Sequence, residues 1–230
     1  MLLCMNYPLN QQVNYYETIV SKLEIIICAF QADNNFVNAL ILFIRVLEEA
    51  MKRAVFLDRD GTINIEKEYL YQIKDFEFVP GAPEAIRLLN QAGIMVVVVT
   101  NQSGVARGYY TEDDVENLHR HIARELERSG AHVDAWLYCP HHPDGRGSYA
   151  LPCNCRKPLP GMLHDAASRY DIDMDNSTMI GDKLADIEAG LAAGCRTVLV
   201  RSGYGAAEEQ HVGPRTDVCD DLLSAVKLLV

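Results

Sequence analysis

Short apolar runs alternate with amphipathic stretches through most of the chain. The runs at 54–57 and 94–99 contain no polar side chain, which is typical of strands buried on both faces of a parallel sheet. Further strands are predicted at 133–138, 178–180 and 197–200. Stretches with helical spacing separate the strands, at 82–91, 111–129, 161–170 and 183–193. This alternation predicts a doubly wound, Rossmann-like α/β fold, in which functional groups collect at the carboxyl ends of the strands.

Residues 1–50 follow a different pattern. Two apolar patches, 25–27 and 39–44, stand in a stretch with several Asn and Gln residues, and 36–50 is predicted as a helix that is apolar on nearly every side. The apolar run is too short to cross a bilayer. Met51, directly before the first strand, resembles a natural start. We therefore expect one domain at 51–230, preceded at 1–50 by an extension that is helical or poorly ordered, or that comes from an upstream mis-start.

The net charge of the chain limits the kinds of ligand that it is expected to bind. The 230 residues carry 21 Lys and Arg against 32 Asp and Glu, a formal net charge of −11. This argues against a general nucleic-acid binder, because such proteins present a basic surface. A small phosphorylated substrate stays compatible, since a metal ion and a few cations can make a site locally positive. No run of eighteen apolar residues occurs and no basic residue precedes Lys22, so neither a membrane span nor a secretory signal is predicted, and a cytoplasmic protein is expected.

Acidic, hydroxyl and basic residues follow the predicted strands in an order that suits phosphoryl transfer. Asp58 and Asp60 come directly after the first strand, where one carboxylate can attack an electrophile while the other moves a proton at the leaving group. Later segments add groups suited to phosphate oxygens or to a metal ion: Thr100, Asn101, Gln102, Ser103, Arg156, Lys157, Asp182, Lys183 and Asp186. Taken singly, each could be a helix cap, a turn or a solvated charge. Their shared position after strands favours one active site.

A second cluster lies in the loop at 139–155. Three thiols and an imidazole form two close pairs there: Cys139, His141, Cys153 and Cys155. This set matches a tetrahedral zinc site, and four protein ligands leave no open position, so the zinc is predicted to be structural. His142 is the alternative imidazole. The other cysteines, which lack partners at ligand spacing, are predicted to be small buried side chains: Cys4, Cys28, Cys195 and Cys219.

The motifs at 58–62, Thr100, Lys157 and 182–186 resemble those of the haloacid dehalogenase-like (HAD) superfamily. The resemblance implies that Asp58 attacks phosphorus, and that Asp60 protonates the leaving oxygen and then activates the hydrolytic water. It also implies that Lys157 and Thr100 stabilise the transferring group. The expected enzyme is therefore a phosphoric monoester hydrolase that forms an aspartyl-phosphate.

The same resemblance implies a catalytic Mg²⁺ held by Asp58, the carbonyl of Asp60, and Asp182, which agrees with the preference of Mg²⁺ for oxygen ligands. It implies that Asp186 orients Lys183 or its loop. Only about eighteen residues separate Gly61 from Pro80, which is too few for a large cap domain over the first motif. A monomer with an open site is expected.

Among zinc-bearing HAD branches, the segments at 100–108, 139–143 and 155–162 resemble the D-glycero-D-manno-heptose 1,7-bisphosphate 7-phosphatases. The resemblance implies that Arg156 binds the retained phosphate, that Glu66 and Tyr69 contact the substrate, and that the product enters nucleotide-activated heptose and lipopolysaccharide core synthesis. The alternative is a histidinol-phosphatase, a branch that usually carries Asp where Ser103 stands.

Two further classes are weighed against this enzyme. A catalytically silent, zinc-stabilised binding protein would not need the intact set of Asp58, Asp60 and Asp182. A nucleic-acid 3′-phosphatase also exists in the superfamily, but no basic, aromatic-rich segment accompanies these motifs.

Overall fold

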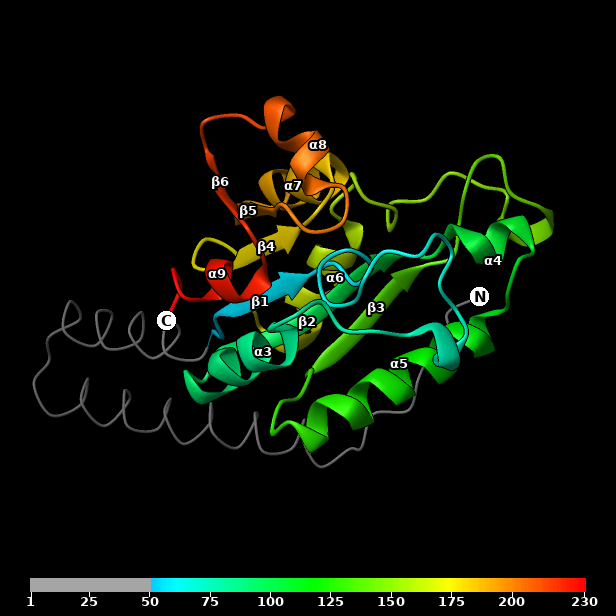
Figure 1. Ribbon diagram of the computed structural model, residues 1–230. Helices are drawn as coiled ribbons and strands as arrows, with labels where there is room; N and C mark the ends of the chain where they lie inside the picture. Colours follow the sequence, from blue (N-terminus) through cyan, green and yellow to red (C-terminus); the bar gives the residue numbers. More distant parts are fainter. Residues whose placement is uncertain (1–50) are drawn as a thin grey trace, which may run out of the picture. The chain divides into compact units, whose positions relative to one another are not determined.

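The computed structural model describes residues 51–230, and the predicted extension at 1–50, with Cys4 and Cys28, lies outside the described residues. Six parallel strands form one sheet in the order β3-β2-β1-β4-β5-β6 (Figure 1). The strands are β1 (Ala54–Leu57), β2 (Met95–Asn101), β3 (Ala135–Cys139), β4 (Thr178–Gly181), β5 (Arg196–Val200) and β6 (Thr216–Cys219). The predicted doubly wound parallel sheet is confirmed.

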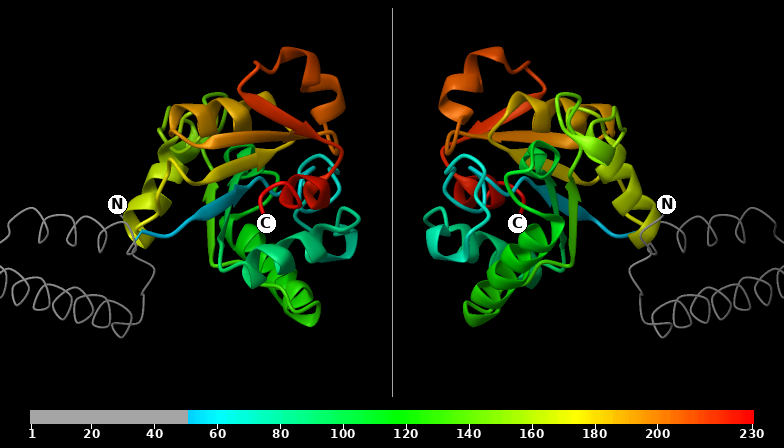
Figure 2. Two further views of the ribbon diagram at one scale, coloured as in Figure 1. Left: turned by 90° about the vertical axis from the view of Figure 1, so that its left-hand side faces the viewer. Right: turned by 90° about the vertical axis from the view of Figure 1, so that its right-hand side faces the viewer.

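Helices cover both faces of this sheet (Figure 2). One face packs against α3 (Ala82–Gln91), α5 (Glu112–Arg128) and α9 (Leu222–Val226). The other face packs against α6 (Gly161–Tyr170) and α7 (Leu184–Ala192). Strand β1 serves both cores, because Val55 and Leu57 enter the first while Ala54 and Phe56 enter the second, as expected when successive side chains point to opposite faces.

The predicted bounds of the helices are confirmed where capping or turn residues define the helix ends. The helices at 82–91 and 161–170 have the predicted bounds. Helix α5 begins after Thr111, whose hydroxyl accepts the N–H of Asp114 at 3.2 Å, while the Asp114 carboxylate accepts the N–H of Thr111 at 2.8 Å. This reciprocal capping satisfies two N–H groups that the helix itself leaves free.

Some predicted bounds are wrong and some elements were missed. The strand predicted at 94–99 runs from Met95 to Asn101, so Thr100 and Asn101 are its last residues. The strand predicted at 133–138 starts two residues too early and ends one too early, since β3 runs from Ala135 to Cys139, which puts the first cysteine of the cluster on a strand. Strand β6 and helix α9 were not predicted. β6 has four residues, and Asp217 within it is exposed, so the sequence pattern there is too short and too polar to stand out.

Between Gly61 and Pro80 the only regular helical element is the single 3-10 turn η1 (Ile73–Asp75). The described residues therefore contain no large cap over the carboxyl edge of β1, as predicted. The short helices α4 (Ser103–Arg107) and α8 (Gly205–Glu208) follow β2 and β5. None of the helices within 51–230 is both long and apolar enough to cross a membrane.

Candidate active site

Residues at or just after the carboxyl ends of β1, β2 and β4 form much of the lining of a pocket of about 490 Å³, and residues from the segments after β3 and β5 complete it. The ends of the first three strands meet because β1 pairs with both β2 and β4, so that Leu57 lies level with Val98 and with Ile180. Every residue that the sequence predicts to react with or bind the substrate lines this pocket: Asp58, Asp60, Glu66, Tyr69, Thr100, Asn101, Gln102, Ser103, Arg156, Lys157 and Lys183. The fold thus brings together side chains from distant segments of the chain.

Lys157 lies buried between two carboxylates. Its Nζ donates to Oδ1 of Asp58 at 2.7 Å and to the carbonyl of Val99 at 2.6 Å, and it lies 2.6 Å from Oδ1 of Asp186. Burial acts to lower the pKa of Lys157, but the two carboxylates outweigh it and raise that pKa above its ordinary value. Lys157 is therefore a fixed positive charge in the pocket.

Asp186 lies closer to the reacting groups than the sequence predicts. Its Oδ2 does accept the backbone N–H of Lys183 at 3.0 Å, so the predicted contact with that loop is present. Its Oδ1, however, pairs with Lys157, which the sequence did not indicate. Burial and the nearby Asp58 raise the pKa of Asp186 to about 6.

Three buried carboxylates, those of Asp58, Asp182 and Asp186, have ligand atoms within 4.8 Å of one another. Oδ1 of Asp182 is buried without a hydrogen-bond partner, and burial together with Asp58 raises the pKa of Asp182 to about 8. A divalent cation would supply the missing partner and offset the repulsion, and carboxylate oxygens are the ligands that Mg²⁺ prefers. The donor set therefore fits a hard divalent cation.

Two glycines allow the chain to pack against this carboxylate. A Cβ atom on Gly61 or Gly203 would collide with the Asp182 side chain. Both residues also have a positive φ, +89° and +59°, which favours glycine. The N–H of the following residue, Tyr204, donates to Oδ2 of Asp182 at 2.9 Å.

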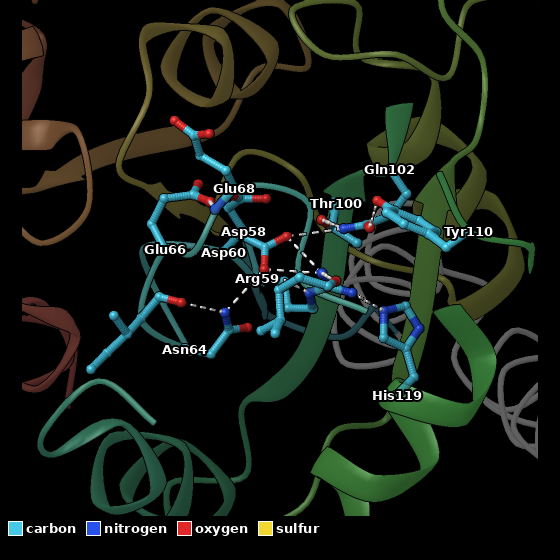
Figure 3. Close-up of polar contacts among 12 residues, drawn as sticks. Asp58, Arg59, Asp60, Asn64, Glu66, Glu68, Thr100, Gln102, Tyr110 and His119 are labelled. Carbon is cyan, nitrogen blue, oxygen red and sulfur yellow. Dashed lines mark hydrogen bonds and ion pairs between the residues drawn. The ribbon is translucent and has the colours of Figure 1, made fainter. Parts of the chain in front are cut away.

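The Asp60 carboxylate points into a different set of contacts (Figure 3). The Arg59 guanidinium, the Asn64 amide at 3.0 Å and the Gln102 amide at 3.0 Å all donate to it. Burial acts to raise the pKa of Asp60, but Arg59 and these hydrogen bonds outweigh burial and lower it below its ordinary value. Asp60 is thus held by neutral and cationic donors, apart from the three carboxylates that fit a cation.

The side chains of two residues predicted to bind substrate form hydrogen bonds to other residues of the protein. The buried Gln102 also donates to Oγ1 of Thr100 at 2.9 Å and accepts the hydroxyl of Tyr110 at 2.7 Å. Asn101 brackets the backbone of Lys157, since its amide donates to the carbonyl at 3.0 Å and its oxygen accepts the N–H at 3.1 Å. Both side chains line the pocket, and both order the groups around it.

The mouth of the pocket is lined by charged and aromatic side chains. Nζ of Lys183 lies 2.8 Å from Oε2 of Glu66 and 4.7 Å from the ring centre of Tyr204. Burial opposes the charge of Lys183, but Asp58 and the other carboxylates raise its pKa above the ordinary value. Tyr69, with 43% of its surface exposed, packs edge-on against Tyr109.

The cysteine and histidine cluster assembles at the end of β3. Sγ of Cys155 lies 3.2 Å from Sγ of Cys139, 3.1 Å from Sγ of Cys153 and 3.3 Å from Nδ1 of His141. Ligand atoms around a tetrahedral Zn²⁺ lie roughly 3.3–3.8 Å apart, as follows from metal–ligand lengths of about 2.0–2.3 Å, so these three contacts are at or just below that spacing. Hydrogen bonds from the neighbouring thiols lower the pKa of Cys155 to about 5. The donor set, three sulfur atoms and one imidazole nitrogen within 4.8 Å of one another, fits zinc.

Of the two candidate imidazoles, His141 joins the cluster, whereas Nε2 of His142 lies 3.3 Å from the guanidinium of Arg107. Cys195 and Cys219 are buried away from it, as predicted. Arg156, next to the last ligand, donates to the carbonyl of His141 at 3.4 Å. The cluster therefore fixes the position of the segment in which Arg156 and Lys157 directly follow Cys155 and line the pocket.

Sequence reasoning missed several residues here. Glu68, Tyr110, Ala185 and Tyr204 also line the pocket, and Arg59 lies behind it. Tyr204 follows β5 closely, so the rule that sites gather after strands could have found it. Arg59 offered no signal of its own, because a charged residue in an acidic turn is usually solvated.

Comparisons with known proteins agree with this site. A family model described as haloacid dehalogenase-like hydrolase matches residues 55–134, and one described as HAD-hydrolase-like matches 154–225. The chain is 49% identical over 178 residues to a D-glycero-beta-D-manno-heptose-1,7-bisphosphate 7-phosphatase of Photorhabdus laumondii, covering 76% of this chain and 95% of that one. It is 46% identical over 160 residues to the enzyme of that name in Pasteurella multocida, covering 69% and 87%.

A solved structure gives the same answer. The D,D-heptose 1,7-bisphosphate phosphatase from B. bronchiseptica, crystallised with magnesium and phosphate, matches with a TM-score of 0.71 and 39% identity, covering 77% of this chain and 97% of that one. Fold, motif order and identity over nearly the full length of these relatives therefore agree. The chain belongs to the haloacid dehalogenase-like hydrolases, in the branch that contains these phosphatases.

Proposed function

We propose that residues 51–230 form a phosphatase that removes the 7-phosphate of D-glycero-D-manno-heptose 1,7-bisphosphate and leaves heptose 1-phosphate. The proposal depends on one observation: Asp58, Asp60 and Lys157 line the same pocket, and Lys157 contacts Asp58. Lys157 lies two residues after the last member of the cysteine and histidine cluster. The names of the relatives supply the substrate. Such a reaction belongs in the synthesis of nucleotide-activated heptose for lipopolysaccharide core, in the cytoplasm.

In the first step, an oxygen of Asp58 attacks phosphorus while the bond from phosphorus to the sugar oxygen breaks. Asp60 is ionised in the free pocket, because its pKa is lowered, so it must take up a proton when the anionic substrate binds. It then gives that proton to the sugar oxygen, so that heptose 1-phosphate leaves and an aspartyl-phosphate remains. In the second step, water attacks the same phosphorus while Asp60 takes a proton from it. The bond from phosphorus to the Asp58 oxygen breaks, which restores the Asp58 carboxylate and releases inorganic phosphate. Lys157 and the hydroxyl of Thr100 stabilise the charge on the transferring oxygens.

The catalytic cation is proposed to be Mg²⁺, held by Asp58, the carbonyl of Asp60, and Asp182. When bound, it supplies positive charge that lets an anionic nucleophile approach an anionic phosphate. The second metal is proposed to be a structural Zn²⁺ on Cys139, His141, Cys153 and Cys155, since these four ligands leave no position for a substrate.

Selectivity is proposed to lie at the mouth of the pocket. Arg156 binds the phosphate that is retained, while Glu66 and Tyr69 contact the sugar. The absence of a large cap among the described residues leaves the pocket open, which suits an elongated substrate with a charge at each end. The protein is proposed to act as a monomer.

A substrate panel tests this function. Phosphate release is measured with both anomers of the heptose bisphosphate, with fructose bisphosphate and with histidinol phosphate, each with and without Mg²⁺. We expect the heptose bisphosphates to be preferred and Mg²⁺ to be required. A preference for histidinol phosphate would move the protein to the other zinc-bearing branch.

Asp58→Asn tests the nucleophile. Because an amide cannot form the acyl-phosphate, we expect phosphate release to fall by at least about three orders of magnitude. The matched control is Asp165→Asn, which alters an exposed carboxylate on α6 that pairs with Arg169 and should keep full activity. Comparable turnover by Asp58→Asn and the wild type would show that another group attacks phosphorus.

A further inference from the structure

Arg59 stands in the chain between the two carboxylates that are proposed to react, yet it is absent from the lining of the pocket. Its side chain is fully buried, with 0% of the residue exposed. A buried guanidinium is costly unless its donors are all engaged. Each of its nitrogens makes a contact, and these contacts lead to three different parts of the fold.

The first contact is with Asp60. Nη2 of Arg59 donates to Oδ1 at 2.9 Å and to Oδ2 at 2.8 Å, and Nε donates to Oδ1 at 3.2 Å. Asn64 and Gln102 each reach one oxygen of this carboxylate, whereas Arg59 reaches both. The planar guanidinium therefore sets the rotation of the carboxylate more strictly than single donors can.

The second contact is with the loop that leads into the pocket mouth. Nη2 also donates to the carbonyl of Leu70 at 3.1 Å. Directly before it, Glu68 and Tyr69 adopt positive φ angles of 44° and 55°, a conformation that costs free energy in residues other than glycine. Both side chains line the pocket. One nitrogen thus joins Asp60 to this loop.

The third contact supports the guanidinium from behind. Nη1 lies 3.3 Å from Nε2 of His119, which is buried and stacks on Trp136 with ring centres 4.7 Å apart. Arginine has no acceptor, so Nε2 must accept and the imidazole must be neutral with its proton on Nδ1. His119 thereby fixes Arg59 from α5, as Figure 3 shows.

We propose that Arg59 is a positioning residue that holds the Asp60 carboxylate and the loop at 66–70 in one arrangement, with His119 as its support. The inference rests on the proposed function, because it assumes that Asp60 protonates the sugar oxygen. Arg59 itself does not touch the substrate. Its removal should therefore impair the step that needs a correctly aimed proton more than it impairs attack by Asp58.

Two substrates separate these effects. The alkoxide of the heptose leaves poorly without a proton, whereas 4-nitrophenolate leaves from 4-nitrophenyl phosphate without one. For Arg59→Lys, which keeps the charge but loses the planar fork, we expect kcat on the heptose bisphosphate to fall by about 10–100-fold, as for other buried supporting groups. Turnover of 4-nitrophenyl phosphate should fall several-fold less. KM for the bisphosphate should rise as the loop loosens.

Three variants make the result decisive. Asp60→Asn gives the full leaving-group effect for comparison, His119→Gln should show a weaker effect of the same kind, and Arg201→Lys, at an exposed ion pair with Glu209, should show none. Thermal unfolding of each variant verifies that it folds. Because Arg59→Lys and His119→Gln preserve charge or an acceptor, at least one of them is expected to fold even if a larger change does not.

Equal losses on both substrates in Arg59→Lys, or no loss at all, would overturn the positioning role. If the wild type shows no activity on heptose bisphosphate, or if Asp60→Asn shows no dependence on the leaving group, the proposed function fails and the role of Arg59 fails with it. A leaving-group effect in Asp60→Asn without one in Arg59→Lys refutes the inference about Arg59 alone.

Discussion

Single aspartates at this site have the same side chain and opposite electrostatic environments. Burial and the neighbouring Asp58 raise the pKa of Asp182 to about 8 and that of Asp186 to about 6. Asp60 keeps 15% of its side chain exposed, and Arg59 and two amides outweigh the effect of burial and lower its pKa. The surroundings thus divide these carboxylates into two kinds. Asp182 and Asp186 would be stabilised by a bound cation, whereas the charge of Asp60 is already compensated by Arg59.

His119 provides a prediction about pH. Burial and then Arg59 hold its pKa well below the ordinary value of 6.5. The folded protein therefore leaves His119 neutral as the pH falls, while the unfolded chain takes up a proton below about pH 6.5. The stability that depends on the neutral imidazole is present above that pH, and it decreases as the pH falls towards the folded pKa, by up to about 1.4 kcal/mol per pH unit.

The test compares urea unfolding of the wild type and His119→Gln at several values between pH 7 and pH 5. We expect the free energy of unfolding to fall less steeply in the variant, because glutamine has no proton to gain. His164→Gln, at an exposed position on α6, is the matched control and should keep the wild-type slope. Equal slopes for all three proteins would contradict the assignment of a neutral buried His119.

At the scale of elements, the segment from the end of β3 to α6 stands out because it has little regular structure. Its only helical element is the 3-10 turn η2 (Gly147–Tyr149). Tyr149 donates to Glu112 on α5, and the cysteine and histidine cluster joins the two ends of the loop. A cross-link by metal can order such a loop where few apolar side chains are available.

Cys153→Ser tests whether this cluster is a local structural zinc site. We expect the variant to lose the zinc, about one ion per chain by the four-ligand count, and to lose most of its activity because Lys157 is no longer held. The far-UV circular dichroism should stay that of a folded α/β protein. Cys195→Ser changes a buried thiol that is outside the group of four ligands, and this variant should keep its zinc by metal analysis. Full activity of Cys153→Ser without zinc would show that the active site does not depend on the cluster.

At the scale of the whole molecule, the excess of acidic residues extends into the pocket. The chain has a formal net charge of −11, and five carboxylates line the pocket beside three cations, Arg156, Lys157 and Lys183. The side chains alone therefore do not make the pocket positive. A divalent cation on the buried carboxylates would offset their charge, so that the three cations can act on an anionic substrate.

The extent of the functional domain is a further prediction. An alignment over 178 residues covers 95% of the Photorhabdus relative, and we propose that residues 51–230 form the phosphatase domain and that 1–50 lie outside it. A chain that begins at Met51 should match the full chain in kcat, KM and melting temperature. A loss of activity or stability on truncation would show that the first fifty residues contribute. Mass spectrometry of protein from its native source would reveal which start is used.

The sequence by itself determined the alternation of strands and helices, the polar residues at the ends of β1, β2 and β4, and the spacing of the cysteines and His141. These follow from local rules, because hydrophobic period and turn chemistry act over a few residues. The magnesium ligands were implied only by the family resemblance, and the structure groups Asp186 with Asp58 and Asp182. Strand β6 was not predicted by these rules, because it is short and polar and forms by pairing with β5 rather than by local preference.

Only the tertiary structure decided which partners the buried charges have. Lys157 pairs with Asp186 as well as Asp58, His141 rather than His142 joins the cysteines, and Arg59 turns inward to Asp60 and His119. Each choice depends on segments that are distant in the chain and on a charge that cannot be buried alone. No local pattern encodes such a contact, because its free energy exists only once both partners have left water.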